Sequence, residues 1–236
     1  MQFDFDLFIR GERACFTQGA FGAERFSSTW PTPSAMAGLL KAIYWKPEID
    51  FQIAAIGLVR PGRREQMTRV ELKSRQGTEP GAPDRTLRST SYLVDVAYRL
   101  RFRIVMAGVP VRKGLKHQSY VEQMRRRLEQ GGHFQQPYLG LREFAASVEL
   151  ANSDDPAQEP LSALDGVSIG QLLGGFAYVP GNDLTFWRKG ADGERRMVSG
   201  RAVPVFFDAE IRDGWIEVPE SLYQRIQAMQ EGCDAA

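Results

Sequence analysis

The segment TPSAMAGLLKAIYWKP, residues 32–47, determines the first helix of the fold and separates two strand-like stretches. Thr32 is a typical helix N-cap, and Pro33 suits the first helical position, where a backbone N–H is not needed. An apolar stripe at helical spacing follows, formed by Met36, Leu39, Leu40 and Ile43. The closing proline predicts that the helix ends after Trp45, which places Tyr44 in its last turn.

Strand-like sequence lies on both sides of this helix. Residues 3–9, FDFDLFI, alternate apolar and acidic side chains, as a half-buried strand does. Residues 51–59 and 66–73 also look like strands, and they are separated by RPGRRE. Because proline and glycine favour turns, we expect these two strands to form a hairpin.

The following residues repeat the strand and helix signals. Residues 91–108 predict a strand, and HQSYVEQMRRRLEQ predicts a second helix that ends at Gly131 and Gly132. REFAASVEL, residues 142–150, predicts another strand. This order suits an α+β fold of the ferredoxin-like (RRM-like) split βαβ type with an inserted hairpin, in which both helices cover one face of an antiparallel sheet.

The composition changes after residue 150. ANSDDPAQEP is acidic, contains prolines and has no apolar period, which is typical of a boundary. The sequence then predicts short strands at 175–180, 184–189, 203–211 and 215–219, and a final helix at 220–230. We therefore expect a ferredoxin-like domain at residues 1–150 and a small β-rich subdomain at residues 151–236.

Length and composition predict a folded protein of the cytoplasm. The chain has 236 residues, of which 43% are hydrophobic and 25% charged. Its two cysteines, Cys15 and Cys233, provide neither a disulfide framework nor metal-ligand spacing. The N-terminal sequence lacks a secretion signal, and no apolar run is long enough to cross a membrane.

Basic residues are concentrated in two parts of the chain, although the net charge is only +1. Residues 60–103 contain eleven Lys or Arg against five acids, and residues 112–127 contain six against Glu122 alone. Arginine suits phosphate recognition, although a solvated charged surface would give the same pattern. The candidate RNA contacts are Arg85, Arg88, Arg99, Arg101, Arg125, Arg126 and Arg127.

Imidazole chemistry is confined to His117 and His133, the only two histidines. Lys116 precedes His117 at the predicted start of the second helix, where its charge and the first N–H groups suit a phosphate. From spacing alone, a solvated histidine near a helix cap is the favoured interpretation of His117, and His133 after a helix end is typical of packing or capping. Metal-ligand, Walker and dinucleotide-binding motifs are missing from the sequence, so we expect neither metal nor cofactor.

Four blocks together resemble a known family. They are TPSAMAGLLKAIYWKP, RTLRSTSYLVDVAYRL, LKHQSYVEQMRRRLEQGGHFQQPYLGLREF and VPVFFDAEIRDGWIEVP. In this order, across both halves of the chain, they are similar to the CRISPR-associated protein family five, subtype I-C (the Dvulg subtype). That family belongs to the repeat-associated (RAMP) RNA-binding superfamily with ferredoxin-like folds.

The resemblance implies a function and a site. Family members of this subtype cut precursor CRISPR RNA within each repeat without a metal, and then stay with the guide RNA among the backbone and large subunits of the type I-C surveillance complex. Tyr44, Lys116 and His117 are implied as the cutting site. Metal-free RNA cleavage needs a base for the 2′-hydroxyl, an acid for the 5′-oxygen and a cation for the phosphorane. His117 and Tyr44 would carry the protons, in either order, and Lys116 the positive charge.

Two other functions remain open from the sequence. A non-catalytic subunit that binds the 5′ tag of the guide RNA would have the same basic segments, but it would not need Tyr44 together with Lys116 and His117. A general single-strand RNA-binding protein would instead use arginine and aromatic stacking on its sheet.

Overall fold

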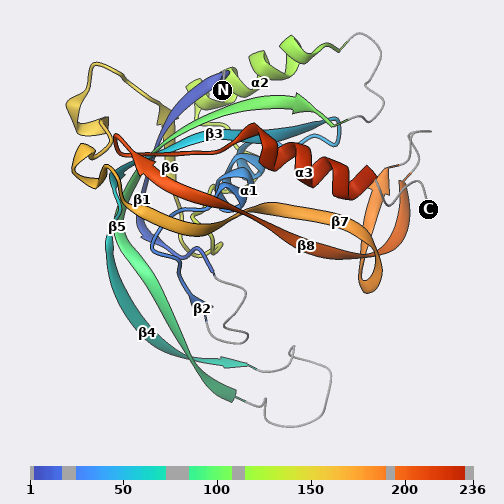
Figure 1. Ribbon diagram of the computed structural model, residues 1–236, viewed down its shortest axis with the longest axis horizontal. Coiled ribbons are helices and arrows are strands. Elements are labelled where there is room, and N and C mark those ends of the chain that lie inside the picture. The colour runs from blue at the N-terminus through green and yellow to red at the C-terminus, as the bar shows by residue number, and fades with distance from the viewer. Residues whose placement is uncertain (1–2, 18–24, 73–84, 108–114, 190–194, 232–236) are drawn as a thin grey trace.

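The computed structural model describes residues 3–17, 25–72, 85–107, 115–189 and 195–231. Its elements are β1 (Phe5–Ala14), β2 (Arg25–Phe26), α1 (Pro33–Ile43), β3 (Ile49–Arg60), β4 (Arg63–Leu72), β5 (Arg85–Met106), α2 (His117–Gln130), β6 (Ser147–Leu150), β7 (Ser168–Lys189), β8 (Arg195–Arg212), β9 (Trp215–Glu217) and α3 (Glu220–Glu231). Strands dominate and helices lie against them, so the predicted α+β class is confirmed (Figure 1). None of the described helices is long and apolar enough to span a membrane.

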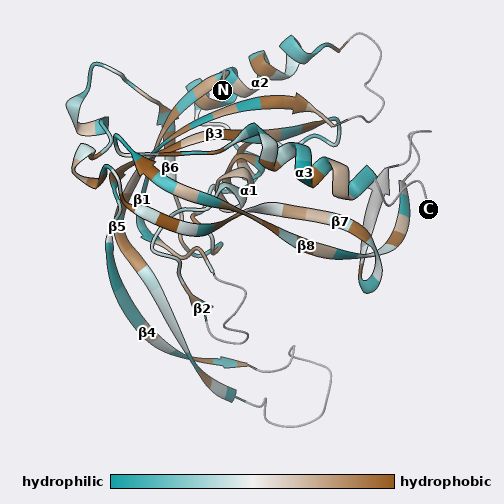
Figure 2. Cartoon of the chain, in the orientation of Figure 1, coloured by the Kyte–Doolittle hydropathy of each residue, from teal (hydrophilic) through white to brown (hydrophobic). Residues whose placement is uncertain are grey.

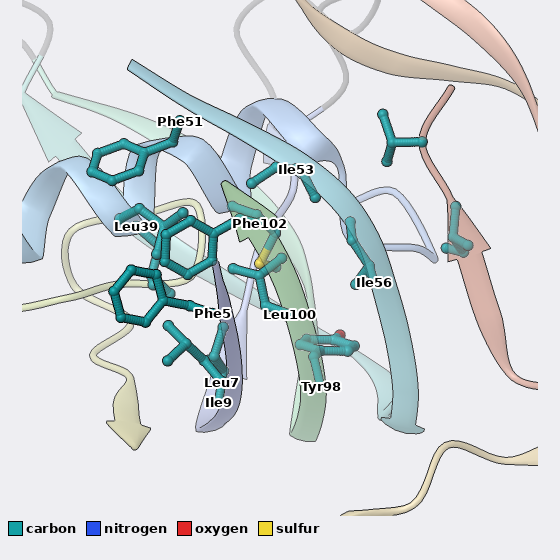
Figure 3. Packing of buried hydrophobic residues seen from close by; sticks show 14 of the residues in the cluster. Phe5, Leu7, Ile9, Leu39, Phe51, Ile53, Ile56, Tyr98, Leu100 and Phe102 are labelled. Atoms are coloured by element: carbon teal, nitrogen blue, oxygen red, sulfur yellow. The ribbon is translucent and has the colours of Figure 1, made fainter. Parts of the chain in front are cut away.

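The long strand β5 organises the sheet. β1 pairs antiparallel with one edge of its second half, and β3 pairs antiparallel with the other edge. The full strand order is β6-β1-β5-β3-β9-β8-β7, with β2 and β4 also paired to β5. Alternate residues of β5, Tyr98, Leu100 and Phe102, are buried on the face where Leu39 of α1 also packs (Figure 3).

The prediction of a hairpin across RPGRRE is wrong. In the described ladders β3 and β4 do not pair with each other, because β3 pairs with residues 97–106 of β5 and β4 with residues 85–94. The chain therefore keeps its direction at Gly62, where φ is +84°, and Asp95 of β5 has φ +59°. Proline and glycine interrupt a strand here instead of reversing it, because β5 is long enough to pair with both segments. β4 and the first half of β5 extend from the body as a curved arm (Figure 1).

α1 begins at the predicted residue. The Thr32 side-chain oxygen accepts a hydrogen bond from the Ala35 N–H at 3.2 Å, and Pro33 occupies the first turn. The buried residues of the helix include the predicted apolar stripe of Met36, Leu39, Leu40 and Ile43. Local capping chemistry and helical spacing were therefore sufficient to locate this element.

α1 ends before the residue expected from the proline. Ile43 is its last residue, and Tyr44 is an extended C-cap with φ −143°. The Ile43 carbonyl accepts a hydrogen bond from Arg127 Nη1 at 2.7 Å, and the Ala42 carbonyl accepts one from the Gln135 N–H at 2.9 Å. These bonds from α2 and the following loop satisfy carbonyls that a helix end leaves open.

α2 has the predicted limits. It starts at His117 and ends at Gln130, and Gly131 takes the left-handed conformation with φ +65°. The Gly132 N–H donates to the Arg127 carbonyl at 2.8 Å, which closes the last turn. Hydrophilic and hydrophobic residues both occur along this helix (Figure 2), and its buried residues are Tyr120, Val121, Met124 and Leu128.

The C-terminal part joins the same sheet. The strands expected at 175–180 and 184–189 are one strand, β7, which pairs with β8 in a long ribbon. β9 pairs with both β8 and β3, and residues from both halves of the chain share one hydrophobic core. The final helix lies at α3, as predicted. The sheet and the core are thus continuous across residue 150.

Gly62→Ala is expected to lower the free energy of unfolding by about 1–3 kcal/mol. A Cβ at this position would lie 2.6 Å from Val96 Cγ1 and 2.8 Å from the Val94 carbonyl oxygen, at a φ of +84°. Gly38→Ala is the matched control, because nothing lies within 4 Å of its added Cβ in α1, and we expect it to be neutral or stabilising. Urea unfolding measures both, and equal midpoints for Gly62→Ala and wild type would contradict the strand-interruption geometry.

Candidate active site

The start of α2 presents Lys116 and His117 at the surface, where both residues are exposed. Lys116 is the N-cap residue, and its carbonyl accepts a hydrogen bond from the Ser119 N–H at 2.9 Å. The Lys116 N–H donates to Ser119 Oγ at 3.4 Å. Because a lysine side chain has donors only, backbone and Ser119 make this cap, and the ammonium group can interact with an anion.

His117 is attached to the sheet through one ring nitrogen. Its Nε2 lies 2.8 Å from the Ile104 carbonyl oxygen near the end of β5. A carbonyl only accepts, so Nε2 carries a proton and donates it. In the neutral ring the lone pair is then on Nδ1, which can take a proton.

Tyr44 lies at the junction between α1 and α2. Its side chain is buried, with a relative exposure of 1%. The hydroxyl donates to Gln123 Oε1 at 2.9 Å, and the guanidinium carbon of Arg127 lies 5.0 Å from the ring centroid. Burial raises the pKa of Tyr44 above its ordinary value, Tyr120 raises it further, and Arg127 opposes the rise. The phenol therefore holds its proton at neutral pH.

These contacts place the Tyr44 side chain against α2, the helix whose start carries the other two candidate residues, Lys116 and His117. Gln123 follows His117 by six residues, which is about 9 Å along a helix axis. Tyr44 therefore meets the middle of α2, while Lys116 and His117 are at its start. The Tyr44 side chain contacts Gln123 and Arg127, whereas the His117 ring contacts Ile104.

Glu48 and Gln123 belong to this neighbourhood, although the sequence did not indicate either. Glu48 is buried, with a relative exposure of 5%, and its Oε2 makes no hydrogen bond to the described residues. Its charge contributes to the raised pKa of Tyr44, and its carbonyl accepts a hydrogen bond from the Ala107 N–H at 2.9 Å. Gln123 is one of several polar residues on an amphipathic helix, so only the tertiary contact distinguishes it.

The three arginines of α2 differ in their surroundings. Arg125 and Arg126 are exposed, and the guanidinium carbon of Arg125 lies 5.3 Å from the Phe5 ring centroid. Arg127 instead caps α1 and covers the Tyr44 ring. The first two are therefore accessible from solvent, while Arg127 has a structural position at the helix junction.

The arginines of β5 differ in the same way. On the arm, Arg85 is exposed and Arg88 pairs with Glu71 at 3.4 Å. In the body, Arg101 pairs with Asp6 at 3.0 Å, and its guanidinium carbon lies 3.9 Å from a ring centroid of Trp215. The side chain of Arg101 is 33% exposed.

Arg99 does not have the surface position that an RNA contact needs. Its side chain is 4% exposed and pairs with Asp6 at 2.8 Å and Glu159 at 3.5 Å. It also donates to Ser153 Oγ at 3.3 Å. Arg99 shares one face of β5 with Arg101, but the segment after β6 covers this face at Arg99 through Ser153 and Glu159. Arg99 is therefore a structural ion-pair residue in this fold.

A surface hollow of about 830 Å³ lies elsewhere, at the far end of β1. Its lining includes three arginines and three acids, namely Arg10, Arg13, Arg60, Glu12, Asp95 and Glu143. The charges of these side chains offset one another, and none of the lining residues belongs to α1 or α2. The hollow is thus separate from the candidate site.

Sequence comparison defines the class of protein. The model of the family described as "CRISPR-associated protein (Cas_Cas5)" matches residues 6–219. The chain is 40% identical over 235 residues to the CRISPR pre-crRNA endoribonuclease Cas5d of Thermus thermophilus, with 95% of each chain covered. It is 35% identical over 232 residues to the protein of the same name from Mannheimia succiniciproducens, covering 90% of this chain and 93% of the relative.

These matches identify a CRISPR-associated protein, and the chain belongs to the Cas5 family. Solved structures support the same fold. The functionally uncharacterized protein SMU1763c from Streptococcus mutans and a CRISPR-associated protein each give a TM-score of 0.58 at 24% identity. The first match covers 92% of this chain and 93% of the other, and the second covers 98% and 94%.

Arg99→Ala is expected to lower the free energy of unfolding by about 3–5 kcal/mol, because it leaves the Asp6 carboxylate without its buried partner. Arg126→Ala is the matched control on an exposed position, where a change within about 0.5 kcal/mol is typical. Chemical denaturation measures both variants. If Arg99→Ala were as stable as Arg126→Ala, the structural assignment of Arg99 would be wrong.

Proposed function

We propose that this protein is an endoribonuclease that cuts precursor CRISPR RNA within the repeat and stays bound to the guide RNA as a subunit of a type I-C surveillance complex. Two relatives named as pre-crRNA endoribonucleases, matched over nine-tenths of the chain, support this function. The observation that carries it here is the exposed pair of Lys116 and His117 at the start of α2, where a helix N-terminus favours a phosphate.

The reaction that fits these residues is attack by the substrate's own 2′-hydroxyl. The 2′-oxygen forms a bond to phosphorus, and the bond from phosphorus to the 5′-oxygen breaks. We assign the 2′-hydroxyl proton to Nδ1 of His117, because Nε2 already donates to Ile104. Lys116 would stabilise the negative charge that develops on the phosphorane oxygens. The products are a 2′,3′-cyclic phosphate and a 5′-hydroxyl, and this route needs no metal ion.

Tyr44 would supply the proton to the leaving 5′-oxygen. Its raised pKa favours the protonated phenol, which suits an acid better than a base. His117 as base and Tyr44 as acid is thus the assignment that agrees with the available Nδ1 of His117 and with the raised pKa of Tyr44.

The scaffold alternative is favoured by one observation, the burial of Tyr44. A subunit that only binds the 5′ tag of the guide RNA would use this tyrosine to pack α1 against α2 and would need no access to its hydroxyl. The basic residues would have the same role in both functions. Cleavage by the isolated protein separates the two.

The remaining parts of the proposal concern partners and architecture. We assign RNA contacts to Arg85, Arg88, Arg101, Arg125 and Arg126, and expect the backbone and large subunits of the complex as protein partners in the cytoplasm.

The order β6-β1-β5-β3 with antiparallel neighbours, combined with α1 and α2, is the arrangement that we interpret as ferredoxin-like. The residues after 150 would then form the β-rich addition to it.

With a chelator present, the wild-type protein should still cut the repeat RNA of its own locus and leave a 2′,3′-cyclic phosphate. His117→Ala should bind this RNA within a few-fold of wild type and cut it ~10²–10⁴ times more slowly, which is the usual contribution of a proton-transfer group. Gel mapping of the RNA ends in single-turnover reactions measures the products and the cutting rate.

His133→Ala is the matched control, because this exposed histidine contacts the Gly131 carbonyl after α2 and lies outside the proposed machinery. It should cut at the wild-type rate. A 2′-deoxy nucleotide at the cut position should abolish cleavage. A requirement for added metal, or wild-type cutting by His117→Ala, would support the scaffold alternative.

Binding of repeat RNA should weaken with salt, with a log-log slope of about −0.7 for each phosphate neutralised on a single strand. Replacing Arg125 and Arg126 together with Ala should flatten this slope by about one to two such contacts, because both side chains are exposed on α2. Lys41→Ala is a control, since this lysine pairs with Asp50 at 2.9 Å. A slope unchanged by the double substitution would place the phosphates on another surface.

A further inference from the structure

The hydroxyl of Tyr44 is held by a side chain with no assigned function. Gln123 Oε1 accepts a hydrogen bond from the Tyr44 hydroxyl, and the two oxygens are 2.9 Å apart. Gln123 is partly exposed on α2, whereas Tyr44 is buried. The amide therefore connects the buried phenol to the surface of the helix that also carries Lys116 and His117.

The direction of this hydrogen bond determines what Tyr44 can do. While the phenol donates to Oε1 of Gln123, its only proton is engaged within the protein and cannot reach a leaving 5′-oxygen. A side-chain amide also carries a donor, Nε2, and a half-turn about its last bond exchanges the two ends. With Nε2 donating to the phenol oxygen, the Tyr44 proton becomes available to another acceptor.

The rest of the phenol environment keeps the ring in place. Arg127 lies over the ring and is itself bound to the Ile43 carbonyl at the end of α1. The backbone N–H of Tyr44 donates to the Leu40 carbonyl at 2.9 Å. Ring and backbone are thus constrained, and the hydroxyl bond to Gln123 is the contact that a rotation of one side-chain amide can reverse.

We infer that Gln123 is a positioning residue for the proposed cleavage, and that its amide must donate to the Tyr44 oxygen for the phenol proton to pass to the leaving 5′-oxygen. This inference rests on the proposed function. The proton balance is complete: His117 takes the 2′-hydroxyl proton, Tyr44 gives its proton to the 5′-oxygen as the bond to phosphorus breaks, and both residues return to their starting forms by exchange with water.

Gln123→Glu tests this inference, because an ionised carboxylate can only accept and would retain the phenol proton. In single-turnover reactions at saturating protein, we expect Gln123→Glu to cut repeat RNA ~10² times more slowly or worse. Gln130→Glu is the matched control, since Gln130 is an exposed residue at the end of the same helix. It introduces the same charge and should cut at the wild-type rate.

A substrate with sulfur in place of the scissile 5′-oxygen separates positioning from a structural effect. A thiolate leaves without protonation, so Gln123→Glu and Tyr44→Phe should both return close to the wild-type rate on this RNA. His117→Ala should remain slow, because the 2′-hydroxyl still needs a base. Melting curves of the variants check that the fold is retained.

The outcomes distinguish this inference from the function on which it rests. If wild-type protein cuts neither substrate, the proposed function fails and the inference fails with it. If wild type cuts both, the inference alone is overturned when Gln123→Glu cuts all-oxygen RNA normally, or when its defect persists with the sulfur substrate.

Discussion

Pairing along β5 is the constraint on which the rest of the structure depends. This strand has 22 residues, and it pairs with β1 on one edge and with β3 and then β4 on the other. These three partners run antiparallel to β5, so the register of β5 sets where they end. It also places the Ile104 carbonyl that accepts the His117 hydrogen bond. The candidate base is therefore oriented by the sheet, although it belongs to an exposed helix start.

The face of β5 opposite the helices is held by charge. Arg99 is almost completely buried, and its cost of desolvation is offset by Asp6 and Glu159. Asp6 comes from β1, whereas Glu159 comes from the segment that leads into the C-terminal half. This ion-pair group, together with β9 against β3, fastens that half to the central sheet. An arginine pattern that resembles a phosphate surface in the sequence thus serves as internal packing at this position.

Local signals in the sequence were sufficient for the helix starts and for the end of α2, and insufficient for the end of α1 and for the strand partners. Thr32, Pro33 and Gly131 act within one turn of the helices they delimit, so their effects are independent of the tertiary fold. The interruption at Gly62 has a turn-like sequence, but its conformation depends on pairing with residues far along the chain. Period-two spacing likewise shows which side chains share a face, and cannot show that a distant segment covers Arg99.

The same distinction applies to the candidate site. Lys116 and His117 are neighbours in the sequence, and the capping of α2 exposes both. The surroundings of Tyr44 depend on contacts with residues about 80 positions away, so the resemblance to a family named the residue without indicating what holds it.

Packing and chemistry at Tyr44 are compatible for a physical reason. A phenol that must give up its proton at one moment of a reaction benefits from a fixed ring and from surroundings that keep it protonated until then. Arg127 fixes the ring while it satisfies an open carbonyl of α1, and burial raises the pKa of the hydroxyl. The helix junction therefore performs a structural task with contacts that would also prepare the proposed acid. What remains adjustable in this arrangement is the hydrogen bond at the oxygen itself, and it is made to Gln123, a side chain whose donor and acceptor ends can exchange.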